Sequence, residues 1–303
     1  MNRSDPSAKR ARYLAVLTAA AAALTLAPGP RAPGQRSVAE GEAALPGAGA
    51  KLSSTPLEEP QPACPTGTVE IEGEYCPVTA QLCLRMVDPK HPERDRCEEF
   101  APSGRCLDPT VHKHFCIDRY EWPDRPGTKP DVAMDWIQAN ALCKAAGKRL
   151  CTDTEWTLAC EGQEHLPYPY GYARNAQACN VDRPYIIPDD DKWANPRTRP
   201  EEILRLDQRD PSGSRESCVS PYGVYDMTGN VDEWVVNEKG NVSDKPYVSG
   251  LKGGYWGPVR DRCRPMTTEH NQWHTGYQIG FRCCEDVPTM PAAPTPPLRA
   301  PGT

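Results

Sequence analysis

The cysteines constrain this chain more than any other sequence feature. All 14 lie between Cys64 and Cys284, and their number is even. An even count behind an export signal predicts a disulfide framework. Zinc is the alternative, but Cys-x-x-Cys pairs are absent, and the spacings of 12, 7, 14, 9 and 10 residues from Cys64 to Cys116 do not match a zinc site. We therefore expect a fold cross-linked by disulfides.

The export signal is predicted over residues 1–30. A segment with four basic residues precedes an apolar run of 15 residues, Tyr13–Ala27, and the sequence PGPRAPG follows it. This three-part pattern is typical of a secretory signal. An uncleaved membrane anchor is the alternative, although the run is short for a bilayer span. Export would place the protein in the periplasm or outside the cell, and after cleavage we expect no membrane span.

Composition divides the rest of the chain. Residues 31–61 are rich in Ala, Pro, Gly and Glu, and residues 287–303 are rich in Pro, so we predict a disordered linker and a disordered tail. The folded domain then covers residues 62–286. A formal net charge of −6 gives no electrostatic support for nucleic-acid binding.

Two helices are signalled within this domain. Capping boxes predict their starts, and Gly147 and Gly162 predict their ends. The boxes pair Asp135 with Gln138 and Thr152 with Glu155. In the second helix, Trp156, Ala159 and Cys160 are expected on one face. Candidate strands cover residues 68–75, 245–256 and 277–285, with long irregular segments between them.

The stretch SPYGVYDMTGNVDEWV, residues 220–235, combines turn signals with buried-type apolar residues and carboxylates. From the residues alone, two interpretations are open. One is a hydrogen-bonded turn with solvated carboxylates. The other is a calcium loop, because calcium takes six to eight oxygens from carboxylates and backbone carbonyls. Asp226 and Glu233 would supply carboxylates, and Gly229 and Val231 would supply carbonyls.

Several segments, in order along the chain, resemble the formylglycine-generating enzymes, or sulfatase-modifying factors. GKRLCTDTEWTLACEG (147–162) is similar to their Gly-Lys-Arg-Leu-Pro-Thr-Glu-x-Glu-Trp segment. YGVYDMTGNVDEW (222–234) is similar to their Tyr-Gly-Leu-Tyr-Asp-Met-x-Gly-Asn-Val-x-Glu-Trp loop. Further family elements are matched by YPYG (168–171), CN (179–180), KGGYW (252–256) and IGFRC (279–283).

This resemblance implies an α+β fold, an irregular, disulfide-rich variant of the C-type lectin-like fold. It implies the disulfides Cys143–Cys283 and Cys160–Cys263. It also implies a structural calcium ion at Asp226, Gly229, Val231 and Glu233, and more weakly a second site that begins at Asn180. Parsimony adds two guesses, Cys179–Cys218 and Cys106–Cys116.

The chemistry departs from that of the family. The family's oxidase binds copper(I) through two cysteines shortly after its Gly-Gly-Ser-Tyr/Trp segment, and thiolates suit copper(I). Here only Cys263 follows, in the context of the structural cysteine, while Gly257 and Pro258 stand near the first ligand's place. We therefore expect no standard formylglycine-generating oxidase.

Other residues offer candidate chemistry in the segment that lines the family's substrate cleft. Glu269, His270 and His274 are the ligand types of a nonheme iron site, although loop hydrogen bonding explains them equally simply. Arg260, Arg262 and Arg264 are candidates for anion binding or for ordinary surface pairing. Glu121 and Trp122 are interpreted as core residues.

Two hypotheses of function follow. The first is an exported maturation enzyme or factor acting on a peptide or peptide-derived substrate. The second is a noncatalytic ligand-binding module on the same scaffold. The missing cysteine pair favours the second, and the histidine-bearing segment favours the first; whether any catalysis remains is left open.

Overall fold

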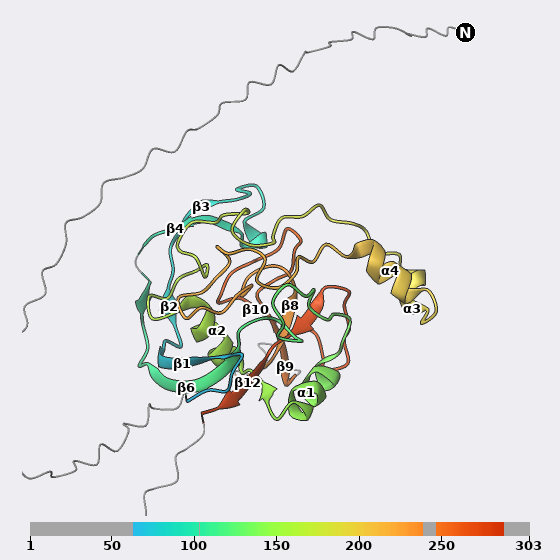
Figure 1. The fold of residues 1–303 in the computed structure, drawn as a ribbon. Helices are drawn as coiled ribbons and strands as arrows, with labels where there is room; N and C mark the ends of the chain where they lie inside the picture. The colour runs from blue at the N-terminus through green and yellow to red at the C-terminus, as the bar shows by residue number, and fades with distance from the viewer. Residues whose placement is uncertain (1–62, 103, 239–246, 288–303) are drawn as a thin grey trace, which may run out of the picture. The chain divides into compact units, whose positions relative to one another are not determined.

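Two four-stranded sheets form the centre of the fold (Figure 1). The computed structural model describes residues 63–102, 104–238 and 247–287. The first sheet has the order β1-β6-β12-β7 and is antiparallel throughout. Its strands are β1 (Thr68–Tyr75), β6 (Val111–Asp118), β12 (Cys283–Asp286) and β7 (Arg149–Leu150). The predicted strand over residues 68–75 is confirmed as β1.

The second sheet has the order β10-β9-β8-β11, and only its β8–β11 pair is parallel. Its strands are β10 (Met266–Thr267), β9 (Ser249–Lys252), β8 (Asp232–Val236) and β11 (Ile279–Phe281). The single strand expected over residues 277–285 is therefore wrong in one respect. The chain leaves the second sheet after β11, passes through Arg282 and enters the first sheet as β12.

The two predicted helices are confirmed, together with their capping boxes. They are α1 (Trp136–Ala145) and α2 (Asp153–Glu161). The expectation of a single buried face on α2 is too narrow, because every residue of this helix is buried. α2 contacts β1 and β6 of the first sheet and β8 and β9 of the second, so both sheets cover it.

Smaller elements complete the fold. Two antiparallel pairs join β2 (Thr79–Ala80) with β5 (Arg105–Cys106) and β3 (Cys83–Met86) with β4 (Cys97–Phe100), and a 3-10 turn covers Pro92–Arg94. Two short helices, α3 (Asp190–Ala194) and α4 (Arg199–Leu206), lie to one side of the sheets (Figure 1). Sequence analysis did not predict these elements, because most are too short to show a period.

Seven disulfides use all 14 cysteines. The structure forms Cys143–Cys283 and Cys160–Cys263, the pairs that the resemblance implies, and also Cys179–Cys218. The guess Cys106–Cys116 is wrong. Cys116 lies on β6 and bonds Cys64, just before β1, while Cys106 on β5 bonds Cys76. The remaining bonds are Cys83–Cys97 and Cys151–Cys284.

The proposed signal (1–30) and linker (31–61) lie outside the described residues, as does the tail from residue 288 onward. Among the residues that the structure describes, no helix is both long and apolar enough to cross a membrane.

The disulfides differ in the length of chain that they close, and this difference predicts unequal contributions to stability. Cys143–Cys283 spans 140 residues and Cys83–Cys97 spans 14. By the chain-entropy model, the free energy of unfolding should fall by about 5 kcal/mol in the Cys143→Ser/Cys283→Ser variant and by about 3 kcal/mol in Cys83→Ser/Cys97→Ser. Guanidinium unfolding of the oxidised proteins measures both. A larger loss in the short-loop variant would show that local packing, not loop closure, sets these contributions.

Candidate functional site

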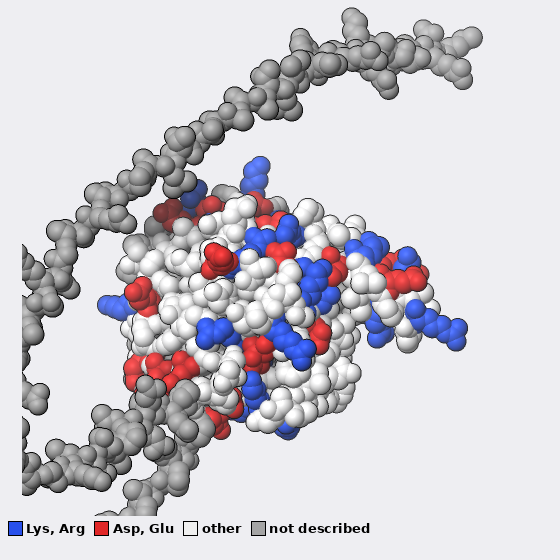
Figure 2. Space-filling view, in the orientation of Figure 1, with Lys and Arg blue, Asp and Glu red and all other residues white. Residues whose placement is uncertain are grey.

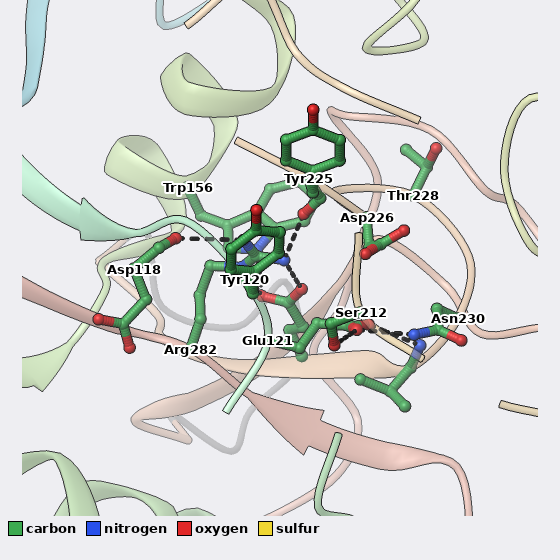
Figure 3. A network of polar contacts seen from close by, with 12 residues as sticks. Asp118, Tyr120, Glu121, Trp156, Ser212, Tyr225, Asp226, Thr228, Asn230 and Arg282 are labelled. Carbon is green, nitrogen blue, oxygen red and sulfur yellow. Dashed lines mark hydrogen bonds and ion pairs between the residues drawn. The ribbon is translucent and has the colours of Figure 1, made fainter. Parts of the chain in front are cut away.

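A buried polar network lies between the two sheets, centred on Arg282 (Figure 3). Arg282 Nε and Nη2 donate to the two carboxylate oxygens of Glu233, each at 2.7 Å. Its remaining N–H groups reach the carbonyl oxygens of Tyr225, Asp118 and Arg119 at 2.9, 3.3 and 3.5 Å. Arg282 therefore joins β8, the end of β6 and the loop before Asp226 through one side chain.

The loop at Asp226 is shaped by left-handed backbone. Asp226, Gly229 and Asn230 have φ values of 56°, 77° and 55°. At Gly229 a side chain is excluded by space as well, because a Cβ atom there would lie 2.5 Å from the carbonyl oxygen of Asn180. The αL conformation and this close approach explain why glycine occupies the turn.

Glu121 fixes this loop from the segment after β6. Its carboxylate accepts hydrogen bonds from Asn230 Nδ2 at 2.7 Å, Ser212 Oγ at 3.0 Å and the backbone N–H of Val231 at 3.2 Å. Trp122 beside it stacks on Phe281 with ring centroids 5.3 Å apart. The pair was interpreted as core, and Glu121 is indeed fully buried, but its role is to orient the loop.

The network contains more negative than positive charge. Glu121, Asp226 and Glu233 are buried carboxylates that interact electrostatically, and Arg282 is the one guanidinium among them. Burial raises the pKa of Asp226 to about 6, and the neighbouring Glu233 adds to the shift. Burial, together with the charges of Asp226 and Glu233, also raises the pKa of Glu121 well above its ordinary value. A bound cation would relieve this excess of negative charge.

The predicted calcium ligands are of a kind that could hold a cation, but hydrogen bonds already occupy most of the capacity of Glu233. Asp226 Oδ2 accepts the N–H of Gly213 at 2.7 Å. Glu233 already accepts three hydrogen bonds, two from Arg282 and one from Trp156 Nε1 at 2.8 Å. Since a carboxylate offers about four lone-pair positions, Glu233 has one left for a metal. Asn180, the weaker candidate, uses its side chain to bind Asn230, Gln208 and Arg183.

A pocket of about 420 Å³ opens beside this network. Its lining comes from the turn after β9, from β8 and from the segment between β3 and β4, and includes Asp232, Gly253, Gly254, Arg260, Pro258, Glu93, Arg94 and Arg96. Gly253 and Gly254 have φ values of 87° and 75°, and the N–H of Gly254 donates to Asp232 Oδ1 at 3.2 Å.

Asp232 is the titratable group that sequence analysis missed. Burial, followed by the repulsion of Glu233, raises its pKa to about 7, although the Gly254 N–H opposes the shift. Its position next to the predicted ligand Glu233 could have drawn attention to it in the sequence. Side chains alternate along a strand, however, so those of Asp232 and Glu233 point to opposite faces of β8. A carboxyl group with this pKa can accept or release a proton near neutral pH.

The three arginines suggested for anion binding are not brought together. Arg260 lines the pocket, is exposed and forms no ion pair with the described residues. Arg262 instead pairs with Asp95 and lies over the ring of Phe100, 5.2 Å from its centroid. Arg264 forms a bidentate pair with the buried Glu161. Only Arg260 is therefore placed to meet a ligand in the pocket.

His270 and His274 do lie together. Their rings stack with centroids 3.8 Å apart, and burial lowers the pKa of both. Glu269 is exposed beside them and opposes the shift at His270. Among the described residues, three close metal-ligating atoms occur at Glu70, Glu72 and His114, and Glu269 does not complete such a triad with the two histidines in this conformation.

The fold and this loop define a disulfide-rich α+β protein of the lectin-like class. Residues 103–287, more than half of the chain, match the sulfatase-modifying factor enzyme 1-like domain. The chain belongs to this family. The match begins after β4, so β1 to β4 precede it although β1 forms part of the first sheet.

The relatives include both a named enzyme and a protein called inactive. The chain is 32% identical over 181 residues to the formylglycine-generating enzyme of Thermomonospora curvata, covering 57% of this chain and 55% of that protein. It is 27% identical over 200 residues to the inactive C-alpha-formylglycine-generating enzyme 2 of Bos taurus, covering 58% and 59%. The chain thus spans under two thirds of these relatives. PvdO of Pseudomonas aeruginosa matches with a TM-score of 0.46 and 18% identity, covering 73% of this chain and 94% of that one.

The Arg282–Glu233 pair yields a test of the network. Arg282→Met should lower the free energy of unfolding by about 3–5 kcal/mol at pH 8, because it leaves buried carboxylates uncompensated. Because burial raises the pKa of Asp226 to about 6, this acid is increasingly neutral below that pH and needs less compensation, so the stability deficit relative to wild type should shrink toward pH 5. Denaturant unfolding at both pH values measures the difference.

The matched control is Glu233→Gln/Arg282→Met, which removes both charges and should recover part of the lost stability. A deficit in Arg282→Met that does not change with pH would contradict the charge explanation and leave lost packing as the cause.

Proposed function

We propose that this protein is an exported maturation factor that holds a peptide or peptide-derived substrate in the Asp232 pocket and does not perform copper-dependent oxidation. The observation that supports it is the pocket itself, which lies at the Gly253–Gly254 turn and has Pro258 in its lining, in the region where the family's oxidase has its cysteine pair. All 14 cysteines of this chain are bonded in disulfides, so none is a thiolate ligand in this structure.

The pocket offers two groups for recognition and proton transfer. Arg260 presents a guanidinium to the opening, and guanidinium groups bind carboxylates in a bidentate geometry. Asp232, with its pKa raised to about 7, offers a proton-transfer group nearby. This combination suits a substrate with a carboxylate near a group that gains or loses a proton, as peptides and peptide-derived compounds have.

A noncatalytic binding module is the second candidate. The same pocket would then hold its ligand without turnover, and one relative in this family carries the word inactive in its name. Metal analysis of protein from an oxidising compartment separates the two. Stoichiometric iron, for which Glu269, His270 and His274 remain the predicted ligands, favours the enzyme, and calcium alone favours the binding module.

The test of the proposed function combines chemistry with binding. Mass spectrometry of a sulfatase-type cysteine peptide, incubated with copper, should show no conversion of the thiol to the aldehyde.

The immobilised protein should also enrich a subset of a random peptide pool with free carboxyl ends. Arg260→Gln should reduce that enrichment about tenfold or more, because it removes a charge-assisted pair. Arg85→Gln, an exposed arginine paired with Glu99 outside the pocket, is the control and should not change it. Aldehyde formation, or equal enrichment by the Arg260 variant, would contradict the proposal.

The same proposal includes a calcium ion. This ion would stabilise the loop around Asp226 and would take no part in a reaction. Asp226, with the carbonyls of Gly229 and Val231 and the remaining position on Glu233, would hold it beside the excess negative charge. At a calcium concentration 100-fold above Kd, the ion would stabilise the native state by about 2.7 kcal/mol.

Removing calcium with a chelator should therefore lower the melting temperature, and added calcium should restore it. Asp226→Asn should abolish this response, while Asp108→Asn, which changes an exposed loop aspartate, should retain it. Differential scanning calorimetry in chelator and in calcium measures the shift. If the wild-type protein gives identical curves in both buffers, the loop binds no calcium and is held by hydrogen bonds alone.

A further inference from the structure

The exposed face of the β1–β6 pair concentrates imidazoles and carboxylates. On β1, Glu70, Glu72 and Glu74 alternate with residues that point to the core, and on β6, His112 and His114 are exposed on either side of the partly buried Lys113. Because side chains two apart on a strand share a face, these five lie on one surface. Acidic side chains gather at the corresponding place in Figure 2, over β1 and β6 of Figure 1. We call this surface the His–Glu face.

The register brings the donors together. Glu72 lies directly opposite His114, and Glu74 lies opposite His112. One donor atom each from Glu70, Glu72 and His114 lie within 4.8 Å of one another. His112 Nε2 lies 3.8 Å from Glu72 Oε1, so Glu72 stands between the two imidazoles.

The charge of this face is unbalanced. Among the described residues, the side chains of Glu70, Glu72 and Glu74 pair with His112 and His114, and Thr110 also hydrogen-bonds to Glu74, but no lysine or arginine forms an ion pair with these glutamates. Lys113, between the histidines, points to the other face and pairs with Glu238. Three like charges along one face of a strand repel one another, and a divalent cation would remove that repulsion.

We propose that the His–Glu face is a binding site for zinc(II) or a similar borderline divalent metal, with His112, His114 and Glu72 as ligands and Glu70 or Glu74 completing the set. Imidazole nitrogen and carboxylate oxygen are zinc ligands at about 2.0–2.2 Å. Ligands in a tetrahedron of that size lie about 3.4 Å apart, so small side-chain rotations close the observed separations. Since the five side chains are between 34% and 61% exposed, such rotations meet little obstruction.

The paired strands supply a rigid support. β1 and β6 pair over eight residues, and the disulfide Cys64–Cys116 ties the start of β1 to β6. The main chain beneath the donors is thus fixed, so metal binding would order only side chains. This site is separate from the Asp232 pocket, and its test does not depend on the proposed function.

The experiment is calorimetric titration of zinc chloride into the disulfide-bonded protein, without a histidine tag and in calcium-containing buffer at pH 7.5. One zinc ion per chain should bind, and binding should weaken at pH 5.5, because metal ligation requires unprotonated imidazole. Loss of a residue that only hydrogen-bonds to a metal ligand weakens metal sites about 10–100-fold, so loss of a ligand itself in His114→Gln or Glu72→Gln should weaken binding at least tenfold. Magnesium should give no signal, since it favours oxygen-only sites.

Two controls assign the site. His91→Gln changes an exposed histidine that pairs with Glu93 elsewhere and should leave zinc affinity unchanged. His270→Gln/His274→Gln removes the stacked pair and should also leave it unchanged. Loss of zinc affinity in the His270→Gln/His274→Gln variant would overturn the proposal. Wild-type zinc affinity in the His112→Gln/His114→Gln variant would overturn it as well. Unaltered circular dichroism of the metal-free variants excludes misfolding as the cause.

Discussion

The arrangement of the two sheets depends on the pairing of Arg282 with Glu233. Arg282 is the residue at which the chain passes from β11 to β12, so its side chain emerges where the sheets meet. All five of its N–H groups have acceptors, which come from β8, from the end of β6 and from the loop before Asp226. A buried charge is tolerated only with such full pairing. One side chain thereby fixes the relative positions of the sheets and the loop.

Disulfides provide much of the remaining cohesion. Several strands have only two to four residues, and long irregular segments connect them. Cys143–Cys283, Cys151–Cys284 and Cys160–Cys263 link helix-bearing segments to the final strands across more than 100 residues. Adjacent Cys283 and Cys284 point to opposite faces of β12, so they reach two different partners. These bonds thus hold together segments that have little regular structure of their own.

Family membership and chemistry separate in this protein. The loop around Asp226, the helix α2 and the Gly253–Gly254 turn are the parts that resemble the formylglycine-generating enzymes, and all three build the scaffold. By the resemblance, Gly257 and Pro258 stand near the place of the first copper ligand. The pocket in this region is lined by charged residues that include Asp232 and Arg260, and the proposed function assigns these two a different use of the same scaffold.

The sequence by itself determined the helix starts, the strand β1 and the family, because capping boxes, alternation and ordered motifs are local signals. It could not show that Arg260 lines the pocket while Arg262 pairs with Asp95 and Arg264 pairs with Glu161. The three arginines alternate along one short segment, so their positions in the sequence do not distinguish them. It also could not show that Glu233 is engaged by Arg282, or that His112 and His114 face three glutamates. Those facts depend on which distant segments meet, and the tertiary structure alone decides that, because side-chain contacts form between residues up to 188 positions apart.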